Sequence, residues 1–107
     1  MNKLISRKLL EIVLDKEISS PIEVRNNRLT YSFGFNEIQF LNLDTLNRLC
    51  KEWLTDGTND IINTFNSTSI DGWVCTSSIY NLRCISKTEL GAILDMTNLV
   101  AEKKGLL

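Results

Sequence analysis

Apolar residues recur at intervals of three or four positions in three stretches of the chain, which is the spacing of one face of an α-helix. The first stretch is residues 3–17, with Asn2 as its candidate N-cap, and the second is residues 45–56, preceded by the candidate N-cap Asp44. In the first stretch, leucines widen the apolar stripe to both sides. A wide stripe indicates a helix that is either well covered or shared with a partner.

The third helical stretch has the clearest boundaries. Ser86-Lys87-Thr88-Glu89 matches a capping box, in which the serine caps the helix and the glutamate reaches back to it. Apolar residues then repeat at helical spacing as far as Ala101, and Gly105 is the expected C-terminal glycine. We therefore expect a helix that begins after Ser86 and ends before Gly105.

Alternating polar and apolar residues predict a β-hairpin over residues 22–33. Asn26-Asn27 lies at its centre, and asparagine tolerates the positive φ angles of a two-residue turn. In this register one face of the hairpin is apolar and the other is polar, as in an antiparallel sheet covered on one side. The register pairs Ile22 with Tyr31 and Val24 with Leu29.

A second hairpin is expected in residues 72–84, with Ser77-Ser78 as its turn, although Ser-Ser is a poor pair for a tight turn. In this register Cys75 and Cys84 are not cross-strand partners, which argues against a disulfide between them. The cross-strand pairs expected are Cys75 with Tyr80 and Trp73 with Leu82.

Two shorter stretches complete the pattern. Residues 38–41 predict a strand, whereas residues 58–65 fit either a short helix or an irregular loop. The 107 residues then follow the order α-β-β-β-α-(α)-β-β-α, without a linker or an internal repeat. This order predicts one α+β domain over residues 1–107. We expect a two-layer sandwich, with helices packed on one face of an antiparallel sheet of about five strands.

The composition excludes several kinds of catalytic and metal site. The chain has no histidine, so it holds no Ser-His-Asp or Cys-His nucleophilic site and no histidine-ligated metal. Its three cysteines form neither a CxxC pair nor a zinc-ribbon pattern, and no phosphate-binding glycine loop or GxSxG motif is present. We therefore expect a protein that is not an enzyme, binds no metal and needs no cofactor.

The cellular location is expected to be the cytoplasm. Cys50, Cys75 and Cys84 are an odd and sparse set, whereas an oxidised framework has an even and dense one, so a reducing compartment is favoured. No stretch approaches the ~20 apolar residues of a membrane span. We therefore expect no membrane association.

The formal net charge of −1 hides an uneven distribution. Residues 29–72 carry two basic and six acidic residues, whereas both flanking segments are mildly basic. An acidic surface accelerates the approach of a basic partner protein. The alternative is that these carboxylates only solvate loops and cap helices. The candidate partner-binding residues are Glu52, Asp56, Asp60 and Asp71.

Four basic residues form a candidate anion or nucleic-acid patch. Arg25 and Arg28 flank the Asn-Asn turn, and Arg7 and Lys8 lie on the first predicted helix. Like charges across a hairpin end repel and are more stable beside an anion, although arginine also prevents pairing at sheet edges. The first five elements resemble the α-β-β-β-α order of double-stranded-RNA-binding domains, but the Lys-rich start of their second helix is absent. The chain also has no RNA-binding motif, which disfavours nucleic acid as the partner.

These exclusions leave a binding module as the expected class. The leading hypothesis is a non-enzymatic inhibitor or immunity-type protein, a bacterial or phage accessory protein that occludes a basic partner protein through its acidic surface. The order of elements is also similar to that of class I type III secretion chaperones. That resemblance implies, as an alternative, a homodimer that acts as a chaperone or adaptor. A nucleic-acid-binding domain is the third alternative.

Overall fold

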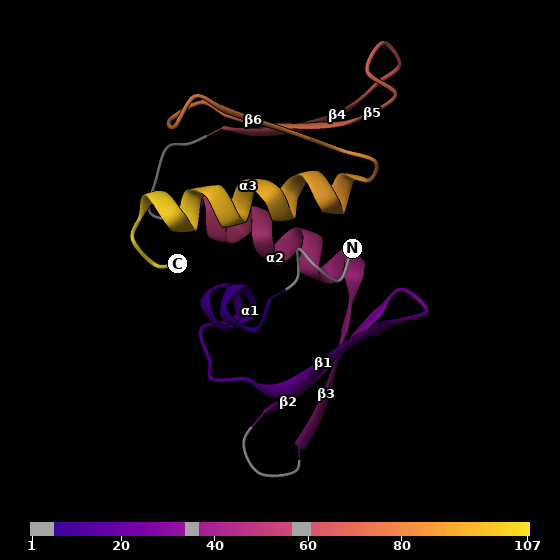
Figure 1. Cartoon of the computed structure of the whole chain (residues 1–107), viewed down its shortest axis with the longest axis vertical. Coiled ribbons are helices and arrows are strands. Elements are labelled where there is room, and N and C mark those ends of the chain that lie inside the picture. Colours follow the sequence, from indigo (N-terminus) through magenta and orange to yellow (C-terminus); the bar gives the residue numbers. More distant parts are fainter. Residues whose placement is uncertain (1–5, 34–36, 57–60) are drawn as a thin grey trace.

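The computed structural model describes residues 6–33, 37–56 and 61–107 of the chain. Within these ranges three helices and six strands follow one another along the sequence (Figure 1). In chain order they are α1 (Arg7–Leu14), β1 (Ser19–Arg25), β2 (Arg28–Phe33), β3 (Glu37–Asn42), α2 (Leu43–Thr55), β4 (Ile62–Ser67), β5 (Gly72–Ser77), β6 (Leu82–Ser86) and α3 (Glu89–Lys103).

The strands form two separate antiparallel sheets, and the helices lie between them (Figure 1). Sheet A has the order β1-β2-β3 and sheet B the order β4-β5-β6. α3 packs against sheet B, α2 packs against α3, and α1 lies between α2 and sheet A. The expected α+β class is confirmed, but the strands do not form the single sheet of about five strands that the sequence predicted.

The sheets are separate because each hairpin takes its third strand from the segment next to it in the sequence. β3 follows the first hairpin and pairs with β2, whereas β4 precedes the second hairpin and pairs with β5. The prediction of a short helix or loop over residues 58–65 is wrong for the part that belongs to β4. Residues 57–60 lie outside the described ranges.

α1 is shorter than the sequence predicted. Its N-cap is Ser6, whose hydroxyl accepts a hydrogen bond from the Leu9 amide at 3.0 Å. The helix ends where Asp15 adopts a left-handed φ of 55°. The expected cap, Asn2, lies outside the described residues.

The first hairpin has the predicted turn. Its two asparagines have φ angles of 53° and 60°, the left-handed values of a tight two-residue turn, and Val24 pairs with Leu29 as expected. Further from the turn the register shifts, and the expected pair of Ile22 with Tyr31 falls in this irregular stretch. The hairpin therefore has a predictable end and an irregular start.

The second hairpin has a longer turn than the sequence predicted. Residues 78–81 connect β5 to β6, and Asn81 supplies the left-handed position with a φ of 52°. Cys75 consequently lies opposite Cys84, and its predicted pairing with Tyr80 is wrong. The tight turn predicted at Ser77-Ser78 does not form. The chain turns over four residues instead, because Asn81 adopts positive φ more readily than serine does.

The N-caps of α2 and α3 each lie two residues from the predicted position. Asn42 Oδ1 accepts a hydrogen bond from the Asp44 amide at 2.8 Å, so Asn42 caps α2. Thr88 Oγ1 accepts one from the Gly91 amide at 3.0 Å, so Thr88 caps α3, and Ser86 belongs to β6. In both places two nearby residues have a side-chain oxygen that can cap a helix. The backbone path of the preceding strand decides which of the two stands at the N-cap position.

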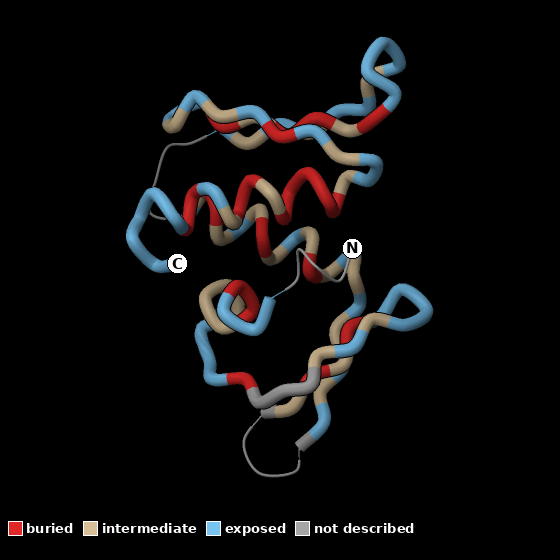
Figure 2. The backbone as a smooth tube through the Cα atoms, viewed as in Figure 1, coloured by how far each residue is buried: buried red, intermediate tan, exposed pale blue. Residues whose placement is uncertain are grey.

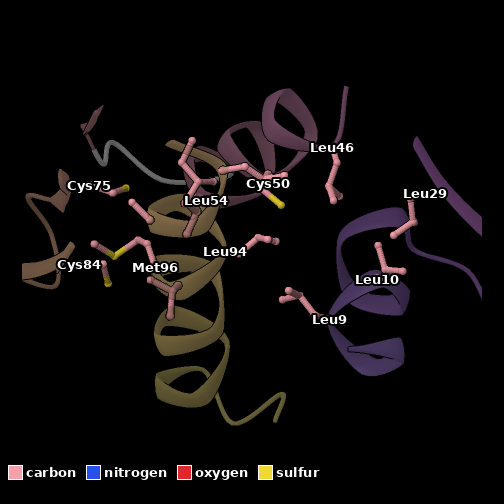
Figure 3. Close-up of a cluster of buried hydrophobic side chains, with 14 of the residues drawn as sticks. Leu9, Leu10, Leu29, Leu46, Cys50, Leu54, Cys75, Cys84, Leu94 and Met96 are labelled. Carbon is pink, nitrogen blue, oxygen red and sulfur yellow. The ribbon is translucent and has the colours of Figure 1, made fainter. Parts of the chain in front are cut away.

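One cluster of buried apolar side chains connects the three helices with both sheets. Figure 2 marks the buried residues along the helices and on the strands that face them. α3 is buried along most of its length, because sheet B covers one side of it and α2 another. Figure 3 shows Leu9 of α1 on the side toward Leu94 of α3 and Leu10 beside Leu29 of sheet A, while Met96 of α3 points toward Cys84 of sheet B. Each such side chain contributes roughly 1.5–3 kcal/mol on burial, so the helical layer holds the two sheets together.

Each sheet also has an outer face that no other described element covers. On sheet A, strand alternation turns Ile38 and Phe40 outward, and they are 61% and 60% exposed. On sheet B, Phe65, Val74 and Ile85 form a row across the three strands; Phe65 and Ile85 are exposed, whereas Val74 between them is fully buried. These faces leave apolar side chains in contact with solvent.

Candidate functional site

α1 and α2 flank an open groove with a volume of about 440 Å³. Its floor consists of half-buried apolar side chains, Ile12 and Val13 of α1 and Leu49 and Trp53 of α2. The other lining residues are carboxylates. We refer to the seven residues together as the acidic groove: Ile12, Val13, Asp15, Leu49, Glu52, Trp53 and Asp56.

Helical spacing explains why α2 contributes apolar side chains to this groove. Leu46, Cys50 and Leu54 recur every four residues and are fully buried in the core. Leu49 and Trp53 also lie four residues apart, one position before two of the buried residues, and so at the flank of the same stripe. The apolar stripe of α2 is therefore wider than the core uses, and its flank remains accessible.

Two of the carboxylates stand at the C-terminal ends of helices. Asp15 is the C-cap residue of α1 and Asp56 is the C-cap residue of α2, and neither helix has a basic residue in its last turn. A helix C-terminus carries partial negative charge, so a carboxylate there adds to the negative potential and does not neutralise it. The groove is consequently an environment that favours a cation.

Two cations of the chain itself already lie at the groove. Glu52 Oε1 is 2.8 Å from Arg48 Nη1 in an exposed ion pair, which stabilises the helix by only a few tenths of a kcal/mol. Lys104 Nζ lies 4.8 Å from the centre of the Trp53 ring. The ring of Trp53 thus binds a cationic side chain from the chain's own C-terminal segment.

A second hollow, of about 490 Å³, continues from the acidic groove. It shares three lining residues with the groove and adds Lys8, Glu11 and Leu106. The two hollows together form an accessible surface along α1 that is longer than a single side chain requires.

Only two of the four predicted acidic residues meet at this site. Glu52 and Asp56 line the groove, whereas Asp71 lies in the turn between β4 and β5. Figure 1 shows that turn at the end of sheet B away from the C-terminal end of α2. Asp60 lies outside the described residues. Sequence reasoning missed Asp15, because it belongs to a segment with net positive charge; its position at the end of a helical stretch was the available signal.

The four predicted basic residues lie in two places. Arg25 and Arg28 are cross-strand partners at the end of the first hairpin and line one small hollow of about 180 Å³. Arg7 forms an ion pair with Glu11 of its own helix, with 3.8 Å between nitrogen and oxygen. Lys8 lines the hollow beside the acidic groove. The structure therefore arranges these residues as two pairs.

The three cysteines are buried, and none of them forms a disulfide. Burial raises the pKa of Cys50 and of Cys84 to about 11, and the Asp95 carboxylate adds to the shift at Cys84. Both thiols are therefore protonated near neutral pH, where a thiol is a poor nucleophile. Their position indicates a role in packing.

Among the residues that the structure describes, no group of three or more His, Cys, Asp or Glu side chains is arranged to hold a metal ion. No helix in these ranges is long and apolar enough to cross a membrane. Comparison of the chain with protein-family models, with curated proteins and with solved structures finds no match.

Proposed function

We propose that this chain is a non-enzymatic protein-binding module whose acidic groove receives a basic, amphipathic segment of a partner protein. The observation that carries the proposal is the meeting of three carboxylates, two helix C-termini and an apolar floor in one groove. A segment with both basic and apolar side chains complements the charge of the rim and the surface of the floor.

The proposed mode of action is that of an inhibitor or immunity protein, which covers a functional surface of its partner. Such a protein needs no chemistry of its own, in keeping with a chain that has no histidine and whose Cys50 and Cys84 thiols stay protonated. Charged residues at the rim speed association, and apolar contacts in the groove slow dissociation. A reducing compartment such as the cytoplasm suits three buried cysteines without a disulfide.

The groove is tested with a synthetic amphipathic helical peptide of lysine and leucine as the probe. In a Trp73→Phe background, Trp53 is the remaining tryptophan and reports directly on the groove. We expect the peptide to change the Trp53 emission and to bind more weakly as salt rises from about 50 to about 500 mM. The triple variant Asp15→Asn/Glu52→Gln/Asp56→Asn is expected to bind at least about tenfold more weakly, a loss of about 1.4 kcal/mol or more.

The matched control is Glu23→Gln/Asp44→Asn/Asp71→Asn, which makes the same change in net charge at exposed positions outside the groove. It is expected to bind the peptide within about twofold of the wild type, because screened charges at a distance contribute little. Equal losses in the two triple variants would reveal unspecific charge attraction and contradict the proposal. In a pull-down from native lysate, the partner is the protein retained by the wild type and the control but lost with the groove variant.

A second candidate function, a homodimeric chaperone or adaptor, is favoured by the exposed side chains of β3. β3 is an edge strand of sheet A, and Ile38 and Phe40 point outward from it. This candidate predicts a particle of twice the 12.2 kDa chain mass in light scattering at about 100 µM protein. It also predicts that Ile38→Ser/Phe40→Ser yields a monomer, and a monomeric wild type at that concentration contradicts it.

A further inference from the structure

The first hairpin ends in two directly opposed arginines. Arg25 and Arg28 are cross-strand partners on the rung next to the Asn-Asn turn, and both are exposed. Directly opposite residues of an antiparallel pair lie on the same face, here the outer face of sheet A, since the neighbouring Leu29 is fully buried. Like charges in this arrangement destabilise the strand pair. The hairpin end would therefore be stabilised by an external anion.

Neither arginine is neutralised within the described parts of the chain. The ion pairs Arg7–Glu11, Arg48–Glu52 and Lys51–Glu89 all involve other residues. The guanidinium carbon of Arg28 instead lies over the Phe40 ring, 5.1 Å from its centre. A guanidinium held against an aromatic ring is oriented in advance, and its N–H groups remain available for hydrogen bonds to an oxyanion.

Apolar side chains continue this surface along β3. Arg25, Asn26, Arg28, Thr30 and Phe40 line the hollow of about 180 Å³. Phe40 is 60% exposed, and Ile38, two residues earlier on the same outward face, is 61% exposed. We refer to Arg25, Arg28, Thr30, Ile38 and Phe40 as the hairpin surface.

We propose that the hairpin surface binds an acidic segment of a partner protein. A carboxylate of that segment lies between Arg25 and Arg28 and accepts hydrogen bonds from both guanidinium groups. An apolar side chain of the same segment covers Phe40 and Ile38. The surface is separate from the acidic groove and takes a ligand of opposite charge, so this inference does not depend on the function proposed above.

The neighbouring residues favour an acidic protein over a nucleic acid. Ile38 makes up much of the exposed apolar surface. Its side chain is aliphatic and offers no ring on which a nucleic-acid base could stack. Glu23 pairs with Thr30 on the same outer face, so the positive charge is confined to the arginine pair, which suits a single carboxylate better than a phosphate on every nucleotide. The chain as a whole has a net charge of −1, so it lacks the positive field that draws in a phosphate backbone.

The probe for this surface is a fluorescein-labelled peptide of about ten residues that alternates glutamate with leucine, so that carboxylates and apolar side chains both reach the surface. The same peptide with glutamine in place of glutamate is the comparison. In fluorescence anisotropy at low salt, the wild type is expected to bind the acidic peptide at least about tenfold more tightly than the glutamine peptide. In Arg25→Gln/Arg28→Gln that preference is expected to disappear.

The matched control is Arg7→Gln/Arg83→Gln, which removes the same charge at exposed positions outside the hairpin surface. It is expected to keep the preference, as is the groove variant Asp15→Asn/Glu52→Gln/Asp56→Asn. Phe40→Ser is expected to weaken binding of both peptides, because it removes the apolar contact. The thermal midpoint of Arg25→Gln/Arg28→Gln should be no lower than that of the wild type, since a repulsive pair is lost.

Three results would overturn the inference. One is an equal affinity of the two double-arginine variants for the acidic peptide. Another is tighter binding of a single-stranded oligothymidylate of about 20 nucleotides, lost in Arg25→Gln/Arg28→Gln, which would identify a nucleic-acid site. The last is self-association of the wild type without peptide that the same two substitutions abolish, since the occupant would then be a second copy of the chain.

Discussion

Glu89, in the first turn of α3, shows how one residue ties three elements together. Its carboxylate accepts hydrogen bonds from Asn47 Nδ2 at 2.7 Å and from Thr64 Oγ1 at 3.3 Å, and Lys51 Nζ lies 3.9 Å away. The carboxylate also lies at the N-terminal end of a helix, where negative charge is favourable. One side chain thereby connects α3 with α2 and β4.

Substitution of Glu89 tests this junction. Glu89→Ala leaves the buried amide of Asn47 without its acceptor, and Asn47 Oδ1 already has no hydrogen-bond partner among the described residues. We expect a loss of about 1–3 kcal/mol in the free energy of unfolding, measured by urea denaturation. Glu89→Gln keeps an acceptor oxygen and is expected to lose less than about half of that. Equal losses in the two variants would mean that the Asn47 hydrogen bond does not carry the effect.

At the scale of single residues, the sequence predicts the backbone conformation where only a few residue types can adopt it. The Asn-Asn turn and Gly105, which has a φ of 74°, are examples, because few residues adopt positive φ without strain. Helix caps are less predictable. Asn42 and Asp44 offer the same kind of oxygen, and only the path of the preceding strand decides which of them caps α2.

At the scale of elements, periodicity located three helices and the first hairpin but missed β4. The strand carries Ile62 toward the core and Phe65 toward solvent, so apolar residues occur on both faces and no clean alternation is visible. The register predicted for the second hairpin is wrong for a different reason. Its register depends on the length of the turn at residues 78–81, and a turn of a different length changes every cross-strand pair after it.

The acidic groove could be predicted from the sequence only in part, because it joins two helices that are distant along the chain. The excess of acidic residues in positions 29–72 predicts Glu52 and Asp56 as binding residues. The wide apolar stripe of the first helix indicates a surface shared with a partner. Asp15 meets them only through the packing of α1 on α2. Asp71 belongs to the same acidic segment of the sequence as Glu52 and Asp56, but it does not lie near them in space. β4 carries the chain to the other end of sheet B before Asp71 is reached.

At the scale of the whole molecule, the two sheets are connected through the helical layer. The chain measures 45 × 30 × 18 Å, with a sheet at each end of the long axis (Figure 1). Leu94 of α3 is fully buried within the cluster that reaches both sheets. We therefore expect both sheets to unfold together although they share no hydrogen-bonded strand pair.

This coupling is tested with Leu94→Ala, which removes buried methyl groups at the centre of the molecule. The expected loss is about 2–5 kcal/mol in the free energy of unfolding. Amide signals of Leu29 in sheet A and Val74 in sheet B, followed by NMR in urea, are expected to disappear at one shared midpoint in the wild type and at a lower shared midpoint in the variant. Two separate midpoints would instead divide the chain into two folding units.

The buried cysteines have a practical consequence for measuring such motions. Cys75 and Cys84 lie opposite each other on the inner face of sheet B, and Cys50 lies on α2, all shielded from solvent. Because a thiol reacts with an alkylating reagent only when solvent reaches it, the rate of modification follows the opening of the core. Mass spectrometry resolves the three sites. The three thiols are thus built-in chemical probes of the order of opening. Faster modification of Cys75 and Cys84 than of Cys50 would mean that sheet B separates from the helical layer before α2 becomes exposed.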